Sequence, residues 1–157
     1  ISRITTVTGH INKPENLLLP IGTLVSDATA ACGGYSEEPA MIIMGGGMTG
    51  VSIPEDGVPI GKASGGIVIY NAKEAAERIE QPCIRCSRCV YACPMGLMPY
   101  QMKYVCEDED LALAEKWDVM DCIVCGSCSY ACPANRRLSE VFKVTKDKIT
   151  LARRKGA

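Results

Sequence analysis

Aromatic residues are scarce in this sequence, at 5 % of 157 residues, with one Phe and one Trp. Hydrophobic residues still make up 47 %, as in an ordinary folded protein, so the core must use aliphatic side chains, Met and a further component. An excess of charge is also missing, because 17 basic and 18 acidic residues leave a net charge of −1. This balance excludes a general attraction of the chain to nucleic acid or to a membrane surface.

Long apolar runs are absent as well. No stretch reaches the ~20 residues of a transmembrane helix, and no signal peptide is visible at the N-terminus. The chain begins at Ile1 rather than at a Met, which suggests a processed product or an excised fragment. Its length allows one compact domain or two small ones.

Cysteine is the residue in clear excess, with ten in the chain. Eight of them form two nearly identical arrays, and only Cys32 and Cys106 lie outside. A secreted disulfide framework is one interpretation of many cysteines. Cysteines at every third residue would form strained and unhelpful loops, however, so the clustering favours metal binding in a reducing compartment. We expect Cys32 and Cys106 to be small buried hydrophobic residues.

Composition changes near Tyr70–Asn71, and we therefore predict two domains, residues 1–70 and 71–157. The first is rich in glycine and has the pattern of short strands with one helix. Strand, helix and further strands predict a small α+β domain of the β-grasp type. The expected strands are Ile4–Val7, Asn16–Pro20, Ala40–Met44 and Gly66–Tyr70, and the expected helix is Thr23–Cys32.

The second region is expected to be mainly helical. Asn71 is a good N-cap with Glu74 as its capping-box partner, so a helix should open the region. Helix formers in Asp108–Lys116 separate the two cysteine arrays, and a final helix should run from Ser139 to about Arg153. The arrays form an internal repeat, because they begin 39 residues apart.

Both arrays have the spacing C-x2-C-x2-C-x3-C-P, as "CIRCSRCVYACP" and "CIVCGSCSYACP". This is the ligand run of bacterial ferredoxins, in which the fourth cysteine binds the other cluster of a two-cluster protein. Three closely spaced cysteines wrap a loop around a cubane, and the loop amides can point at its sulfurs. The spacing therefore predicts two [4Fe–4S] clusters, with Cys83, Cys86, Cys89 and Cys132 as ligands of cluster 1 and Cys122, Cys125, Cys128 and Cys93 as ligands of cluster 2.

Two structural zinc sites are the alternative, because zinc ribbons also use C-x2-C pairs. Zinc does not require the third cysteine three residues later, nor the Cys-Pro that follows, so the iron–sulfur interpretation is favoured. All eight array cysteines are used as ligands, and no nucleophile is paired with a base. We therefore predict no catalytic residue. Ile84, Val90, Ile123 and Val124 are expected to shield the clusters from water.

The segments "PCIRCSRCVYACPMGLMP" and "DCIVCGSCSYACPANRRL" resemble the cluster region of the C subunit of the Rnf complex, RnfC, also called RsxC. "TVTGHINKP", "PIGT" and "IIMGGGMTG" resemble its soluble-ligand-binding β-grasp (SLBB) segment, and "PIGKASGGIVI" resembles the link to its ferredoxin part. Ser87 replaces a frequent Gly of the family, and "GGGMTG" replaces the usual "GGPMMG". Neither departure affects a ligand, but the second leaves the shape of that loop open.

The resemblance implies an electron-transfer subunit of a membrane-associated ferredoxin/NAD oxidoreductase coupled to sodium or proton translocation. Such a subunit is peripheral, on the cytoplasmic face of the bacterial membrane, with other members of the complex and soluble ferredoxin as partners. In the family FMN and NADH bind an N-terminal part that this chain lacks. A cobalamin reductase-type electron-transfer flavoprotein fragment is the alternative, and a structural metal protein is a third class.

Three weaker signals have simple interpretations. Gly45, Gly47 and Gly50 fit a dinucleotide motif, but Pro54 follows soon and position 70 is Tyr, so a tight turn is favoured. His10, the single His, is expected in a surface turn. A basic series near the C-terminus is expected to be a solvated helix face, with docking to an acidic partner or anionic lipid as the alternative; it comprises Arg136, Arg137, Lys143, Lys146, Lys148, Arg153, Arg154 and Lys155.

Overall fold

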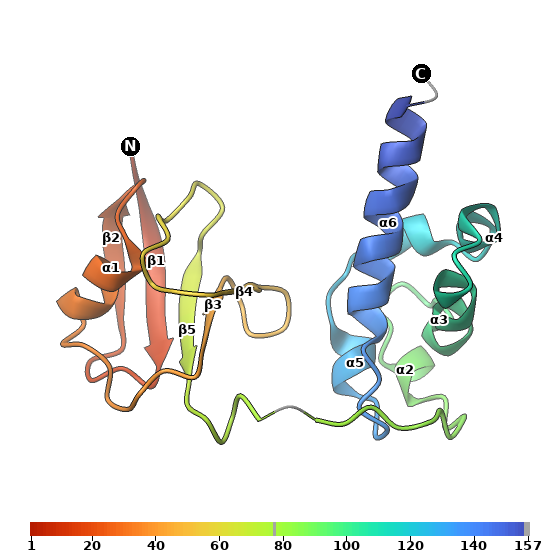
Figure 1. Cartoon of the computed structure of the whole chain (residues 1–157), viewed down its shortest axis with the longest axis horizontal. Helices are drawn as coiled ribbons and strands as arrows, with labels where there is room; N and C mark the ends of the chain where they lie inside the picture. The colour runs from red at the N-terminus through yellow and green to blue at the C-terminus, as the bar shows by residue number, and fades with distance from the viewer. Residues whose placement is uncertain (77, 156–157) are drawn as a thin grey trace. The chain divides into compact units, whose positions relative to one another are not determined.

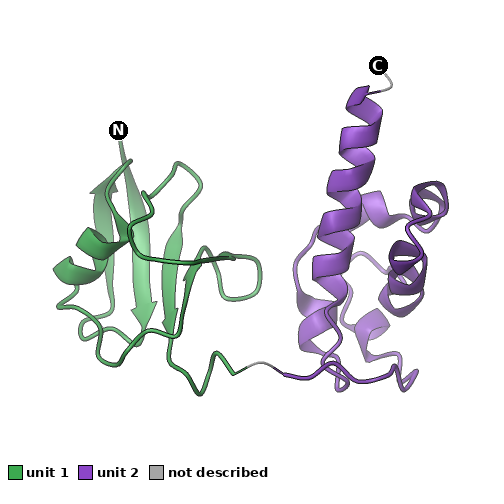
Figure 2. Cartoon of the chain, viewed as in Figure 1, with its two compact units in different colours: residues 1–77 green, residues 78–157 purple. Residues whose placement is uncertain are grey.

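The computed structural model describes residues 1–76 and 78–155, and the chain divides into two compact units, residues 1–77 and 78–157 (Figures 1 and 2). Unit 1 is a sheet with one helix, and unit 2 is helical. Among the described residues, no helix is both long enough and apolar enough to cross a membrane.

Unit 1 is built on a five-stranded mixed sheet in the order β2-β1-β5-β3-β4. Strand β1 pairs antiparallel with β2 and parallel with β5, while β3 pairs antiparallel with both β5 and β4. The five strands are β1 (Ser2–Gly9), β2 (Glu15–Pro20), β3 (Met41–Met44), β4 (Val51–Ile53) and β5 (Gly66–Tyr70). The four predicted strands are present, and β4 is an addition.

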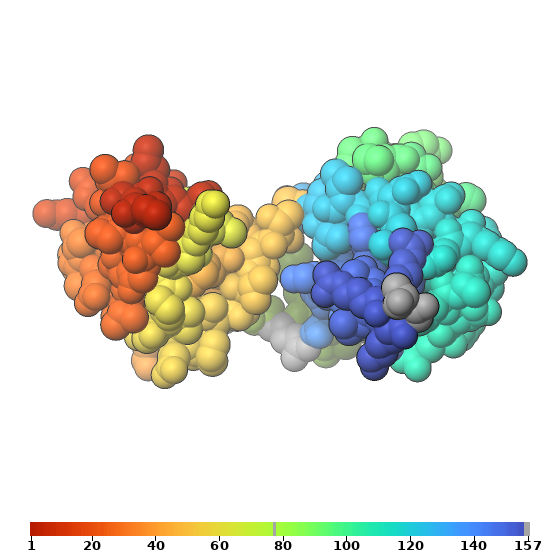
Figure 3. Space-filling model, turned by 90° about the horizontal axis from the view of Figure 1, so that it is seen from above, coloured from red at the N-terminus to blue at the C-terminus, as the bar shows by residue number. Residues whose placement is uncertain are grey.

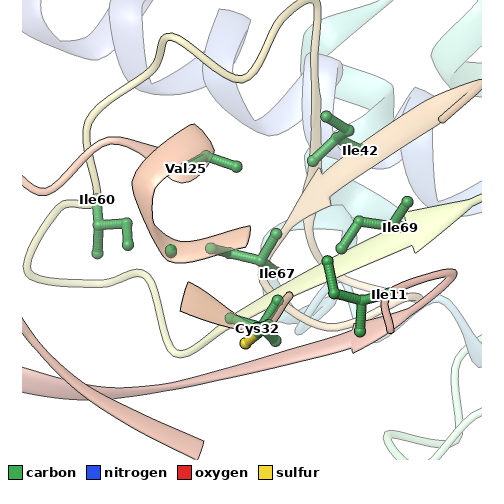
Figure 4. Close-up of a cluster of buried hydrophobic side chains, with 9 residues drawn as sticks. Ile11, Val25, Cys32, Ile42, Ile60, Ile67 and Ile69 are labelled. Carbon is green, nitrogen blue, oxygen red and sulfur yellow. The ribbon is translucent and has the colours of Figure 1, made fainter. Parts of the chain in front are cut away.

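The core of unit 1 lies between the sheet and helix α1 (Val25–Ala31). Alternate residues of β5 point into it, because successive side chains of a strand face opposite sides of a sheet. Ile67 and Ile69 are therefore fully buried, and Figure 4 shows them facing Val25 of α1 and Ile42 of β3. Cys32 is also fully buried in this cluster, as predicted.

Two glycine positions explain how the strands end. Gly9 has φ +92°, and a Cβ atom there would lie 2.1 Å from the carbonyl oxygen of Ile69. The paired strands β1 and β5 therefore admit no side chain at this position. Residues 45–50 form the turn between β3 and β4, closed by a hydrogen bond from the Gly50 amide to the Gly46 carbonyl at 2.7 Å. The predicted tight turn is confirmed.

The helix predicted to begin at Asn71 does not form in the described residues 71–76. The Asn71 side chain does accept the Glu74 amide at 3.0 Å, but only one turn follows. The reason is that a short helix needs an apolar face to bury, and Ile79, which should have continued that face, is 76 % exposed. The side chains of Asn71 and Glu74 instead form hydrogen bonds within unit 1, with Glu37 at 2.9 Å and His10 at 3.0 Å respectively.

Unit 2 packs short helices around one long helix, α6 (Figure 1). Leu138, Phe142, Thr145 and Ile149 of α6 are buried and form one stripe at helical spacing. Figure 3 shows the C-terminal part of α6, in blue, beside the segment in cyan and teal that contains α4 and η1. The elements are α2 (Arg88–Tyr91), α3 (Pro99–Glu107), α4 (Leu111–Lys116), η1 (Val119–Asp121), α5 (Ser127–Tyr130) and α6 (Leu138–Lys155).

Helices α3 and α6 contact each other and enclose the core of unit 2. Met102 and Cys106 of α3 are buried with Phe142 of α6, so the expectation for Cys106 is confirmed. Helix α4 is capped by Asp110, whose carboxylate accepts the Leu113 amide at 2.9 Å. The predicted final helix is confirmed, whereas α3 is an addition.

Candidate metal centres

The two cysteine arrays have the same backbone conformation. In the first array, Arg85 and Ser87 have positive φ angles of 54° and 59°. In the second, Val124 and Gly126, each 39 residues later, have φ angles of 53° and 81°. Two left-handed residues at matching positions curl each loop before a short helix, α2 or α5, begins.

The left-handed residues turn backbone amides toward sulfur. The amide of Arg85 donates to Cys83 Sγ at 3.4 Å, and the amide of Val124 donates to Cys122 Sγ at 3.4 Å. A β-branched residue such as Val124 adopts this conformation only at a cost of ~1–3 kcal/mol. Strain that recurs at the same place in both copies of a repeat indicates a functional loop.

The eight array cysteines line two cavities. The first cavity is lined by Cys83, Cys86 and Cys89 together with Cys132 from the other array. The second cavity is lined by Cys122, Cys125, Cys128 and, from the first array, Cys93. Their empty volumes are about 360 and 340 Å³, in both cases partly open to solvent. Each cavity thus contains the four cysteines that the ligand spacing groups together.

The fourth cysteine of each array is positioned by a second left-handed turn. After Cys93 the chain reverses at Gly96, with φ 66°, whose amide donates to the Cys93 carbonyl at 3.2 Å. After Cys132 it reverses at Asn135, with φ 51° and the equivalent bond at 3.1 Å. Helices α3 and α6 start three residues after these turns. Each array is therefore linked rigidly to a helix of the core.

The described Cys, His, Asp and Glu side chains contain no group of three or more that could hold a single metal ion. A structural zinc site would need four sulfurs within ~2.3 Å of one point. The four cysteines of each cavity instead surround an empty volume, with sulfur donors around its wall. This donor set fits a cubane cluster, in which each thiolate binds a different iron.

The cysteine thiols differ in how easily they ionise. Burial raises the pKa of Cys128 to about 11, and burial also raises the pKa values of Cys89 and Cys122. The backbone amide of Arg85 lowers the pKa of Cys83, and a hydrogen bond with the Ser127 hydroxyl lowers that of Cys125. Bound iron would hold all of them as thiolates, since metal coordination deprotonates a thiol.

The two cavities differ in their remaining walls. The second is closed mainly by apolar side chains, including Leu97, Met102 and Phe142. The first is lined by Arg85 and Arg136. This difference was not predicted from the sequence, although position 97 is Leu and position 136, its equivalent in the repeat, is Arg.

A charge network lies beside the first cavity. Lys103, 1 % exposed, pairs with Glu80 and, at 3.4 Å, with Glu107. Arg136, 8 % exposed, donates to Glu80 at 3.2 Å and lies 3.6 Å from Glu107. Two cations thus face two carboxylates. Sequence reasoning missed Lys103 because no helix was predicted at this position and a lysine by itself carries no signal of burial.

The predicted shielding residues are only partly in place. Ile84 lines the first cavity and Ile123 lines the second, but their exposed fractions are 67 % and 59 %. They lie at the mouths of the cavities and do not seal them. The apolar closure of the second cavity comes instead from α3 and α6, through Met102 and Phe142.

The expectation of a solvated basic face is wrong for part of the C-terminal basic series. Arg136 is buried, and the ammonium of Lys146 donates to the carbonyl oxygens of Met120 and Cys122. Other members form ion pairs within unit 2: Lys148 with Glu109 and Arg153 with Glu115. His10 lies in unit 1, at the end of β1, as expected of a turn residue.

Two family models match the chain, one in each unit. The SLBB domain covers residues 4–52, and the 4Fe-4S dicluster domain covers residues 82–136. The second match contains both cysteine arrays. The predicted fold class, α+β with an SLBB-like β-grasp domain before a mainly helical dicluster ferredoxin-like domain, is confirmed.

Curated relatives cover nearly the whole chain. The C subunit of the ion-translocating oxidoreductase complex of Rhodobacter capsulatus is 47 % identical over 96 % of this chain and 29 % of its own length. The C subunit of the proton-translocating ferredoxin:NAD(+) oxidoreductase complex of Clostridium ljungdahlii is 44 % identical over 93 % of this chain and 32 % of its own length. The C subunit of the Na(+)-translocating ferredoxin:NAD(+) oxidoreductase complex of Acetobacterium woodii is 38 % identical over 98 % of this chain and 35 % of its own length. The chain spans about a third of the length of these relatives.

Proposed function

Because the chain belongs to the family of the C subunits of ion-translocating oxidoreductase complexes, we propose that unit 2 relays single electrons through two [4Fe–4S] clusters. The first cavity would hold one cluster through Cys83, Cys86, Cys89 and Cys132. The second would hold the other through Cys122, Cys125, Cys128 and Cys93. The observation that supports this most directly is the exchange of the fourth cysteine between the arrays at the two cavities.

The clusters would supply reversible one-electron chemistry, and the chain supplies their setting. Backbone amides of Arg85 and Val124 point at ligand sulfurs, an arrangement that stabilises added negative charge. Met102 and Phe142 exclude water from the inner wall of the second cavity. All eight cysteines are engaged as ligands, so neither cluster offers an open iron to a substrate. The role of unit 2 is therefore transfer, without catalysis at its own residues.

The wider setting is also part of the proposal. The relatives' names describe subunits of complexes that couple ferredoxin:NAD(+) oxidoreduction to ion translocation. We propose that this chain works beside the other subunits of such a complex, on the cytoplasmic face of the membrane, with soluble ferredoxin as a redox partner. FMN and NADH would bind outside the third of the relatives that this chain spans. These names favour the Rnf-type role over cobalamin reduction.

Anaerobic preparation followed by reduction tests the proposal. The expected result is a brown protein in which both clusters accept an electron from a low-potential donor and return it to an oxidant. Electron paramagnetic resonance of the fully reduced chain should show two interacting centres, because the shared helices hold the clusters close together. Stoichiometric zinc in a colourless protein would contradict the relay and would support a structural metal protein. A bound corrinoid would support the cobalamin alternative.

A further inference from the structure

Arg136 and Leu97 occupy equivalent positions of the internal repeat. Each lies four residues after the last cysteine of its array, and each lines the cavity that contains this cysteine. The backbone around them is duplicated, including the left-handed turns at Gly96 and Asn135. The two candidate sites thus share a backbone scaffold, and at this position of the wall the first cavity has a cation where the second has an apolar side chain.

The guanidinium of Arg136 is fixed in place. It is 8 % exposed, donates to Glu80 at 3.2 Å and to the Tyr104 hydroxyl at 3.2 Å, and lies over the Tyr104 ring at 5.1 Å. It lines the first cavity together with Cys83 and Cys132. Arg136 therefore places a fixed positive charge in the wall of the first cavity, which is the property of a preorganised electrostatic group.

The second cavity has a cation nearby, but it acts differently. Lys146 directs its ammonium to the backbone carbonyls of Met120 and Cys122 and does not line the cavity. Leu97 and Met102, which do line it, offer no hydrogen to a sulfur. The sulfur ligands in this cavity are therefore stabilised by a backbone amide at Cys122, by the Ser127 hydroxyl, which lies 3.4 Å from Cys125 Sγ, and by a cation outside the cavity wall.

We propose that the cluster site formed by Cys83, Cys86, Cys89 and Cys132 has the higher reduction potential of the two, and that Arg136 is the positioning residue that sets the difference. Reduction adds negative charge to the cluster and its sulfurs, and a fixed cation in the cavity wall stabilises that charge more in the reduced state than in the oxidised state. A single electron on the chain then rests at the first site, and the second site is the stronger reductant. This inference rests on the proposed function.

The source of the effect is the position of one cation rather than the net charge of its network, because Arg136 lines the first cavity and Lys103, Glu80 and Glu107 do not. Arg136 and Lys103 together carry two positive charges, and Glu80 and Glu107 carry two negative charges, so the network is neutral as a whole. Removing Arg136 alone leaves one uncompensated carboxylate beside the cluster. Removing Arg136 and neutralising Glu80 together keeps the network neutral and isolates the loss of the cation from the cavity wall.

The test is an anaerobic redox titration of the cluster-loaded full chain, followed by electron paramagnetic resonance. The wild-type chain should show two midpoint potentials. Arg136→Leu should lower the higher midpoint potential. At a fixed applied potential the ratio of reduced to oxidised cluster at that site should fall about tenfold, which corresponds to a shift of about 59 mV for one electron. The gap between the midpoints then narrows. The double variant Glu80→Gln/Arg136→Leu should lower the same midpoint by less.

Lys146→Met is the matched control at the second site. It should lower the midpoint potential of that site and so widen the difference between the two midpoint potentials. An unchanged or wider gap in Arg136→Leu, with iron content intact, would overturn the proposal. If Arg136→Leu loses iron, Arg136→Gln replaces it, because Gln keeps donors for Glu80 and Tyr104 without the charge. Loss of iron in both would assign Arg136 a structural role and would also overturn the proposal. A wild-type chain without clusters would instead refute the proposed function.

Discussion

Cys93 and Cys122 line the same cavity, although one ends the first array and the other begins the second. Cys132 in turn lines the cavity of the first array. The exchange is possible because each fourth cysteine is followed by a turn into α3 or α6, and these helices pack against each other. Neither array can complete a four-cysteine site alone, so loading of the two sites should depend on the folding of unit 2 as a whole.

The buried lysine of the charge network should matter for stability. Lys103→Met should lower the free energy of unfolding of unit 2 by ~1–2 kcal/mol, because it leaves the partly exposed carboxylates of Glu80 and Glu107 to share Arg136 alone. Lys143→Met, at an exposed position of the same unit, should change it by less than ~0.5 kcal/mol. Denaturant unfolding followed by helical circular dichroism measures both. Equal stability of the two variants would refute the structural importance of the network.

The same network predicts a dependence on pH. Burial alone would raise the pKa of Glu80, but hydrogen bonds from Lys103 and Arg136 outweigh it and hold the pKa below the ordinary 4.5. The carboxyl therefore stabilises the fold fully above pH 4.5, and this contribution is lost as the pH falls through the lower pKa of the folded state.

The acid dependence can be isolated with Glu80→Gln, which has no carboxyl to titrate. The difference in unfolding free energy between wild type and Glu80→Gln, measured in the cluster-free reduced chain, should be largest at neutral pH and shrink below pH 4.5. A difference that grows as the pH falls would have the wrong sign for a stabilising Glu80 carboxylate.

Thiol reactivity should follow the pKa differences. In the cluster-free chain, Cys83 and Cys125 should react with iodoacetamide before Cys128, because a thiolate is the nucleophile and burial raises the pKa of Cys128 to about 11. A short labelling pulse and peptide mass spectrometry report each site. Faster labelling of Cys128 would contradict the structure of the second cavity. Denatured protein, in which all cysteines label alike, is the control.

The left-handed turn after the first array can be tested at Gly96. No atom lies within 4 Å of the position that a Cβ would take there, so a substitution acts on the backbone alone. Gly96→Val should lower stability by ~1–2 kcal/mol, whereas Gly96→Asn should be nearly neutral, because Asn135 already adopts this conformation in the second array. Thermal unfolding of the two variants measures the difference, and equal midpoints would count against a conformational requirement.

Local patterns predicted much of this molecule. The predicted strand Gly66–Tyr70 is present as β5, and the predicted final helix is present as α6. Helix α3 was missed although Pro99 stands at its first turn, a favoured start. Conversely, the capping residues Asn71 and Glu74 predicted a helix that no buried face supports.

The cysteine ligands could be predicted from the sequence because their spacing is local. The residues that form the cavity walls could not be predicted in this way. Met102 and Phe142 reach the second cavity only through the packing of α3 on α6. The pairing of Lys103 with Glu80 joins residues 23 positions apart, and nothing in either residue's neighbours indicates it. Tertiary contacts of this kind leave no periodic trace in a sequence.

Crossed ligation is tested most directly by a pair of variants that keep only one complete set of ligands. Both variants replace Cys122, Cys125 and Cys128 by Ser, and one adds Cys93→Ser while the other adds Cys132→Ser. Iron and acid-labile sulfide are then counted per chain. We expect about four of each in the variant that retains Cys132, and incomplete loading in the variant that retains Cys93. The reverse result would show that each array binds its own cluster and would contradict crossed ligation.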